Sequence, residues 1–68
     1  MNDTPWAMIR YEYDALNNPV YEGRHKSPGV GDSDKGWYLY KYSWDSTGNM
    51  ILKQGPKIGA WDNRTSFF

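Results

Sequence analysis

The chain contains no cysteine and only one histidine among its 68 residues. Without cysteine, the protein has neither a disulfide nor a thiolate ligand to stabilise a small domain, and one histidine does not complete a metal site. No apolar run approaches the ~18–20 residues that a membrane-spanning helix needs. We therefore expect no metal, no cofactor and no membrane partner.

An excess of charge of one sign is also missing. Eight basic residues balance eight acidic ones, so the formal net charge is zero. Neither sign forms a long run, whereas binding to nucleic acid or to an anionic membrane requires a basic patch. Residues 1–5 lack the basic start and apolar stretch of an export signal. The expectation is a protein made in the cytoplasm that does not bind nucleic acid.

Groups suited to catalysis are scarce. His25 lies between Arg24 and Lys26 with no nucleophile in an obvious relation to it, and its polar surroundings predict an ordinary surface side chain. Most of the candidate carboxylates fall at predicted turns, where capping of the backbone explains them. These carboxylates belong to Asp14, Glu22, Asp32, Asp34, Asp45 and Asp62. We therefore expect no enzymatic activity.

The chain is rich in aromatic side chains. Four Trp, six Tyr and two Phe make up 18% of the residues. A domain of this size hides only about 60% of its unfolded surface, and each large ring can remove about 150–250 Å² from water. The rings must therefore supply most of a thin core in what is one domain at most.

The sequence resembles itself at an offset of 31 positions, which aligns segment 6–14 with segment 37–45. Both segments begin with Trp, carry an aliphatic residue two positions later, and end in a cation, Tyr, one variable residue, an aromatic residue and Asp. The match extends into the next turn, where Asn17-Asn18 aligns with Gly48-Asn49. Two copies are too few for a solenoid, but they are enough for two related hairpins.

The residue types in both copies favour strands, since Tyr, Trp and aliphatic residues suit a half-buried pleated surface. We predict strands near 6–13, 19–25, 37–44 and 50–54. Asp14 and Asp45 begin the two turns, where their carboxylates can accept backbone N–H groups, and Asn17 or Gly48 takes the left-handed conformation. No segment has sustained helical periodicity.

The predicted fold class is all-β, a small antiparallel four-stranded meander or partly open barrel with a docking C-terminal tail. The single domain divides into hairpin 6–25, loop 26–36, hairpin 37–54 and tail 55–68. Gly, Pro, Ser and Asp dominate the loop, and residues 55–59, which begin Gly55-Pro56, predict a second break before the tail.

The segment 37–44 places large side chains on both faces of its predicted strand. One face carries Trp37 and Leu39. The other carries an aromatic stripe, which consists of Tyr38, Tyr40, Tyr42 and Trp44. One sheet and a short tail are too little to cover both faces. Either the sheet curls or the tail crosses it, leaving ordinary cross-strand pairs, or part of the aromatic surface is a subunit interface.

The tail offers two alternatives. Trp61 at a sheet edge, with Arg64 paired to a carboxylate such as Asp62 or Asp32, would form a structural clasp. Alternatively, the terminal Phe67 and Phe68 anchor in a neighbouring subunit. The predicted structural residues are Trp6, Trp37, Trp61, Asp62, Arg64, Gly48 and Asn49. The predicted interface residues are Tyr38, Tyr40, Tyr42, Trp44, Phe67 and Phe68.

Several short motifs between positions 21 and 66 resemble a known class of proteins. They are Gly23, Ser33-Asp34-Lys35-Gly36-Trp37, Leu39, Lys41, Trp44-Asp45, Gly48-Asn49 and Trp61-Asp62-Asn63-Arg64. The pattern resembles short proteins encoded in the structural modules of tailed bacteriophages, although those close on Trp-Asp-Asp-Arg and carry aliphatic residues at positions equivalent to Tyr42 and Trp44.

The resemblance implies a virion component such as a tail, fibre-attachment or capsid-associated protein, located in the virion and made in the host bacterial cytoplasm. Its partners would be other virion proteins or copies of itself in a homo- or hetero-oligomer. The excess of aromatic side chains also favours an assembly role, because a small domain in a symmetric assembly can complete its core against neighbours. The alternative function is a small carbohydrate-binding or other ligand-binding module that uses exposed aromatic rings.

Overall fold

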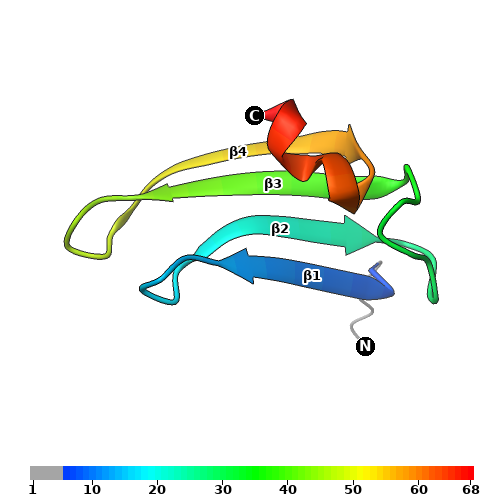
Figure 1. Ribbon diagram of the computed structural model, residues 1–68, viewed down its shortest axis with the longest axis horizontal. Coiled ribbons are helices and arrows are strands. Elements are labelled where there is room, and N and C mark those ends of the chain that lie inside the picture. The colour runs from blue at the N-terminus through cyan, green and yellow to red at the C-terminus, as the bar shows by residue number, and fades with distance from the viewer. Residues whose placement is uncertain (1–5) are drawn as a thin grey trace.

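The computed structural model describes residues 6–68; residues 1–5, on which the expectation about export rests, lie outside this described part. The strands are β1 (Met8–Tyr13), β2 (Pro19–His25), β3 (Trp37–Trp44) and β4 (Met50–Gly59), followed by the short 3-10 helix η1 (Trp61–Phe67). The strands form one antiparallel sheet in chain order, with β1 and β4 at its edges (Figure 1). The prediction of an all-β meander with a docking tail is confirmed.

The two hairpin turns share one design. The Asp14 carboxylate accepts backbone N–H groups from the residues two and four positions ahead, both at 2.9 Å. Asp45 does the same at 3.0 and 2.9 Å. Asn17 and Gly48 have φ values of 67° and 90°, in the left-handed region. The predicted turn chemistry is confirmed in both copies, because an Asp side chain can replace the backbone acceptor of a tight turn.

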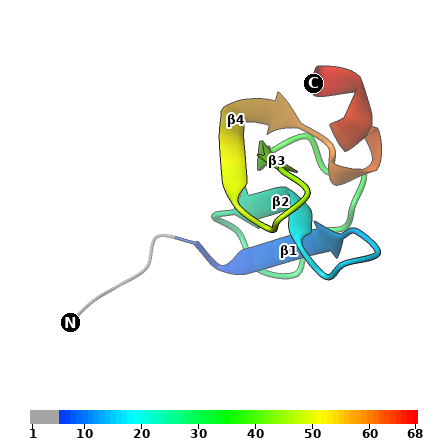
Figure 2. The same ribbon diagram turned by 90° about the vertical axis from the view of Figure 1, so that its left-hand side faces the viewer.

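Strand β4 corrects the prediction of a break at residues 55–59. It continues to Gly59 and absorbs Gly55-Pro56 as an irregularity, so that Leu39 pairs with Lys57 while Lys41 pairs with Gln54. Gly55 has a φ of 116°, and a Cβ there would lie 2.5 Å from the Leu39 carbonyl oxygen. Figure 2 shows β4 changing direction along its length. Gly and Pro therefore bend this edge strand instead of ending it.

The core lies on one side of the sheet, which we call the helix face because η1 covers it. Trp37 and Leu39 are fully buried there, together with Trp61 from η1. The Trp37 indole N–H donates to the Gly31 carbonyl at 3.1 Å, which ties the 26–36 loop to the core. Trp61 packs over the sheet at Gly23 and does not insert at a sheet edge as predicted, because Gly23 leaves room for the indole on the face itself.

The tail docks as predicted, but as a short helix that the sequence did not predict. Its seven residues are too few to show helical periodicity. The predicted partners of Arg64 were also wrong. Arg64 Nε donates to Glu12 at 2.7 Å, while Asp32 lies 3.0 Å from Arg10 Nε. The reason is the position of Arg64 on η1. Its guanidinium lies over the Trp61 ring, 4.5 Å from the ring centre, and close to β1, which carries Glu12.

Candidate protein-binding surface

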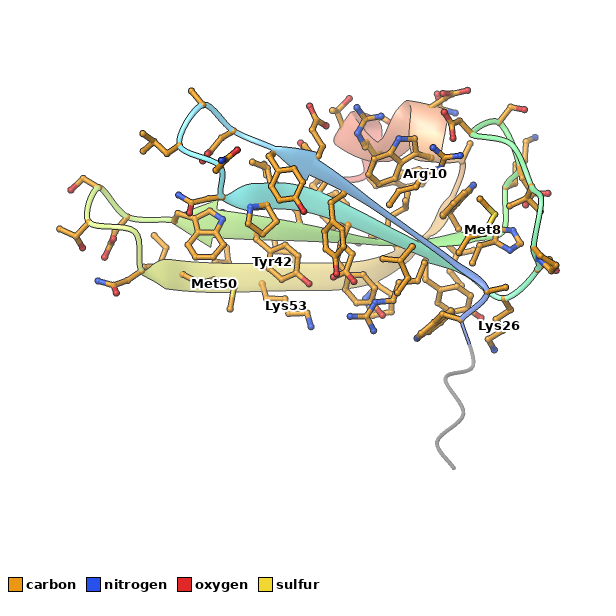
Figure 3. The ribbon with its side chains drawn as sticks, turned by 90° about the horizontal axis from the view of Figure 1, so that it is seen from below. Met8, Arg10, Lys26, Tyr42, Met50 and Lys53 are labelled. Atoms are coloured by element: carbon orange, nitrogen blue, oxygen red, sulfur yellow. The ribbon has the colours of Figure 1, made fainter. Side chains whose placement is uncertain are left out.

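The face of the sheet opposite η1 is the aromatic face, which we define by Tyr11, Tyr38, Tyr40, Tyr42 and Trp44. Alternation along β3 places Tyr38, Tyr40, Tyr42 and Trp44 on the face opposite Trp37 and Leu39. All four are half-buried. Figure 3 shows Tyr42 and Lys53 together on this face, with Arg10 on the side of η1. The predicted aromatic stripe is therefore assembled on one face of the sheet.

Cations of the chain itself lie over these rings. Arg24 is 5.1 Å from the centre of the Tyr40 ring, and Lys53 lies at 5.1 Å from Tyr40 and 5.7 Å from Tyr42. Lys26 lies 5.3 Å from the centre of the Tyr38 ring. Cations held over ring faces gain from the ring quadrupole and also cover the rings. The stripe is thus occupied by internal contacts along much of its length.

Trp44 lies at one end of the aromatic face, and Trp6 packs against the other end. The Trp6 ring meets Tyr38 edge-on, with 5.0 Å between ring centres. The Trp44 indole N–H donates to the Pro19 carbonyl at 2.7 Å, which joins the two hairpins. Both tryptophans are half-buried. They bridge strands of the sheet, a role that gives each ring a packing partner within the chain.

A buried carboxylate lies at the centre of the aromatic face. Glu22 is 2% exposed, accepts a hydrogen bond from Arg24 Nε at 2.6 Å and accepts another from the Tyr42 hydroxyl. Burial acts to raise the pKa of Glu22, but hydrogen bonds from Arg24 and Tyr42 outweigh it and lower the pKa below the ordinary value. Burial and the hydrogen bond to Glu22 raise the pKa of Tyr42. The cluster holds an ionised carboxylate between strands.

The two terminal phenylalanines do not join the aromatic face. Phe68 packs against Tyr21 with 6.2 Å between ring centres, and both Phe67 and Phe68 pack on the core of the helix face. A Cβ at Gly59 would collide with the Phe67 ring. The six residues predicted as an interface therefore lie on two opposite faces, and both phenylalanines already have partners within the chain.

The residues predicted as structural lie in four places: the core, the aromatic face, the second turn and η1. Trp37 and Trp61 are in the core, Trp6 is on the aromatic face, and Gly48 and Asn49 are in the second turn. Arg64 is half-buried on η1, whereas the neighbouring Asp62 side chain is exposed. Asp62 contributes through its backbone N–H, which donates to the Asp32 carbonyl at 3.0 Å. That hydrogen bond fastens η1 to the 26–36 loop.

His25 corrects the prediction of a surface side chain. It is 8% exposed, and its ring packs edge-on against Trp37 with 5.3 Å between centres. Ser27 N–H donates to Nδ1 at 3.0 Å, so Nε2 carries the proton and donates to Asp34 at 2.7 Å. Hydrogen bonds from His25 and from the Gly36 N–H lower the pKa of Asp34. The arrangement orders the loop between the hairpins.

Apart from Leu16 in the first hairpin turn, the large apolar side chains that are exposed lie on the two edge strands. On β1 they are Ile9, Tyr11 and Tyr13, with 49%, 46% and 55% of their surface exposed. On β4 they are Met50, Ile51, Leu52 and Ile58. These side chains were not predicted as interface residues, although a four-stranded meander leaves its first and last strands at the edges. The run Met50-Ile51-Leu52, which does not alternate with polar residues, was a further available signal.

The described residues, 6–68, enclose no pocket, and no three His, Asp or Glu side chains among them gather around a common point that would suit a metal ion. Within the same part of the chain, no helix has the length and apolar character required to cross a bilayer. Comparison of the chain with protein-family models, with curated proteins and with solved structures finds no match.

Proposed function

We propose that this protein is a structural assembly protein that acts through protein–protein contacts made by the edges of its sheet. The observation that carries the proposal is the exposure of large apolar side chains along both edge strands, where backbone N–H and C=O groups also lack a neighbouring strand. Exposed apolar surface of this kind is typical of interaction sites. A chain of this size has no surplus core in which to hide it.

The aromatic face supports the proposal less directly. Rings that stack on a sugar need an open face, but Tyr38, Tyr40 and Tyr42 lie beneath Arg24, Lys26 and Lys53 of the same chain. The described residues also lack a pocket that would orient a small ligand. Carbohydrate binding is therefore the weaker candidate, and glycan-array binding that is lost in Tyr38→Ala or Tyr40→Ala would support it.

The setting of the assembly is proposed from the resemblance to phage structural-module proteins. The motifs that carry the resemblance fall at structural positions of this fold: Gly23 beneath Trp61, Gly48 in a left-handed turn, and Trp61 in the core. A virion would supply other virion proteins or further copies of the chain as partners. Closed symmetric assemblies cover edges that a monomer leaves open.

Size-exclusion chromatography with light scattering tests the proposal on the pure protein. We expect association that grows with concentration and that weakens when an exposed apolar side chain of an edge strand is replaced by lysine, in Ile9→Lys on β1, in Ile51→Lys on β4 or in both. Leu16→Lys is the control, because Leu16 is 75% exposed at a hairpin turn and not on an edge strand. A monomer at every concentration, with all three variants behaving alike, would contradict the proposal.

A further inference from the structure

This inference rests on the proposed function and names one partner, a second copy of this chain. We infer that two copies pair antiparallel along the outer edges of their β1 strands, about a two-fold axis at Tyr11. The pairing would join two four-stranded sheets into one continuous sheet. An isologous contact of this kind places the same strand of each copy against its equivalent.

The outer edge of β1 is open and lacks the features that protect edges. In the described sheet order, β1 has one neighbour, β2. Its six residues, Met8–Tyr13, include no Gly or Pro and no irregularity before the last pair. Such an edge presents backbone donors and acceptors to an added strand. Within residues 6–68, no strand pairs with this outer edge.

The other edge is guarded. Strand β4 contains Gly55-Pro56, which bends the strand and removes a backbone N–H. Its charged residues are Lys53 and Lys57, with no acid between Met50 and Gly59. Lysine and proline on an edge strand are common means of preventing strand addition. The comparison favours β1 as the edge that pairs.

Charge complementarity fixes the register. With the axis at Tyr11, Arg10 lies opposite the partner's Glu12, and Glu12 opposite the partner's Arg10. Moving the axis to Arg10 or to Glu12 would set two arginines or two glutamates face to face, which is destabilising. Because the net charge of the chain is zero, the copies as wholes do not repel one another.

The same register pairs the apolar side chains on the aromatic face. Ile9 lies opposite the partner's Tyr13, and Tyr11 lies opposite its own equivalent across the axis. These three are the exposed large apolar residues of β1. Aromatic and β-branched residues make favourable cross-strand neighbours. The pairing would therefore cover both the open backbone and the exposed apolar surface of β1.

Arg10 and Glu12 can still pair across the two-fold axis, although each already lies beside an oppositely charged side chain of its own chain. Arg10 Nε lies 3.0 Å from Asp32, and the two side chains are 38% and 41% exposed. Glu12 accepts from Arg64 at 2.7 Å, with the Glu12 side chain 45% exposed. A second copy would extend these two ion pairs into a network of alternating charges on the helix face.

Engineered cysteines test the register, because the natural chain has none. Under oxidised glutathione, Tyr11→Cys should form a disulfide-linked dimer, since opposed residues lie within the Cα separation of about 4.4–6.8 Å that a disulfide allows. Ile9→Cys alone should not, because its two copies would be four residues apart along the strands, or about 13 Å. A mixture of Ile9→Cys and Tyr13→Cys should give the mixed dimer.

Ile51→Cys on β4 is the matched control and should remain uncrosslinked. Unfolded or nonspecifically colliding chains would crosslink in every variant alike, including Ile9→Cys alone, and that result would overturn the inference. Light scattering of the wild-type chain is run in parallel. Association without the Tyr11→Cys crosslink, or with efficient Ile51→Cys crosslinking, overturns β1 pairing while the proposed function stands.

A charge swap provides a second measurement. Arg10→Glu should weaken association, because the new glutamate lies opposite the partner's Glu12 and, by the two-fold symmetry, the partner's new glutamate lies opposite Glu12. The double variant, Arg10→Glu with Glu12→Arg, should restore association, because the swapped charges again complement one another across the axis. Both internal ion pairs stay broken in the double variant. Failure of the double variant to recover, while it remains folded by circular dichroism, would overturn the inference.

Discussion

At the scale of single residues, Gly23 determines how the tail meets the sheet. It lies in β2 directly beneath Trp61, and a Cβ there would come within 2.6 Å of Trp61 Cε3 and 3.1 Å of Trp37 Cε3. Both contacts are with rigid indole rings in the core. Because cores are packed like organic crystals, neither ring can yield without displacing its neighbours.

We predict that Gly23→Ala lowers the free energy of unfolding by about 1–3 kcal/mol, the usual cost of overpacking. Gly31→Ala is the matched control. No heavy atom lies within 4 Å of a Cβ built at Gly31, so this variant should unfold at the same urea concentration as the wild type. Urea unfolding followed by tryptophan fluorescence measures both. Equal midpoints for the two variants would show that Trp61 does not pack where the structure places it.

Glu22 makes stability depend on pH. Its folded pKa lies below the ordinary value of 4.5. The ionised carboxylate therefore adds stability above the unfolded pKa, and this contribution is lost as the pH falls through the folded pKa. Asp34 and Asp45 also have lowered pKa values and contribute in the same direction.

We predict that Glu22→Gln destabilises the protein at neutral pH by about 1–3 kcal/mol, because it leaves Arg24 without its buried carboxylate. The variant should also lose less stability than the wild type when the pH falls from 6 to 3, since one site of proton uptake is gone. Tyr42→Phe keeps the carboxylate but removes a donor, so its acid transition should move to higher pH. Thermal melts across this pH range measure all three proteins, and parallel curves for wild type and Glu22→Gln would contradict the prediction.

At the scale of elements, η1 depends on the sheet for its existence. A single short 3-10 helix has poor hydrogen-bond geometry and little stability of its own. Its attachment includes the Trp61 ring in the core, the Arg64–Glu12 ion pair and the Asp62 backbone hydrogen bond to the loop. Phe67, the last residue of the helix, also packs on the core, so η1 docks through contacts at both of its ends.

We predict that Trp61→Ala and Trp37→Ala each unfold the domain. Truncating a buried large aromatic residue costs about 3–5 kcal/mol, which is comparable to the whole stability expected for a domain of this size. Asn63→Ala is the control, because Asn63 is an exposed residue of the same helix. Circular dichroism at 25 °C should show a folded control and two unfolded tryptophan variants. Folded tryptophan variants would place these rings outside the core.

At the scale of the whole molecule, the sheet is asymmetric. The helix face is covered by η1, while the aromatic face is covered by cations of its own chain, and β1 and β4 each have only one neighbouring strand. The buried hydrophobic core of the described residues consists of Trp37, Leu39, Ala60 and Trp61. Because this core is small, any contact that covers further apolar surface should add appreciably to the stability of the folded state.

We predict that the melting temperature rises with protein concentration, because association that requires the folded state stabilises it by mass action. A tenfold increase in concentration should raise the melting temperature by several degrees, given shifts of about 4–8 °C per kcal/mol for a domain of this size. Scanning calorimetry at two concentrations measures the shift. Tyr11→Lys should abolish it, whereas an unchanged melting temperature in the wild type would speak against assembly.

Features that depend on neighbouring residues, the strands and the turns, could be predicted from the sequence. The strands near 6–13, 19–25 and 37–44 and both turns follow from residue preferences and from the Asp14 and Asp45 carboxylates, which act within a few residues of their own position. The aromatic stripe could be placed on one strand face by alternation alone. Its role as an interface remains a prediction.

Long-range geometry was decided by the tertiary structure. Whether Gly55-Pro56 ends or bends a strand depends on the pairing of β3 with the residues on either side, Gln54 and Lys57. Whether Arg64 meets Glu12 or Asp32 depends on where η1 comes to lie. The sequence determined the strands, the turns and the excess of rings, because those properties are local or compositional. Burial, the bend of β4 and ion pairs between distant residues depend on the path of the entire chain, which only the assembled sheet defines.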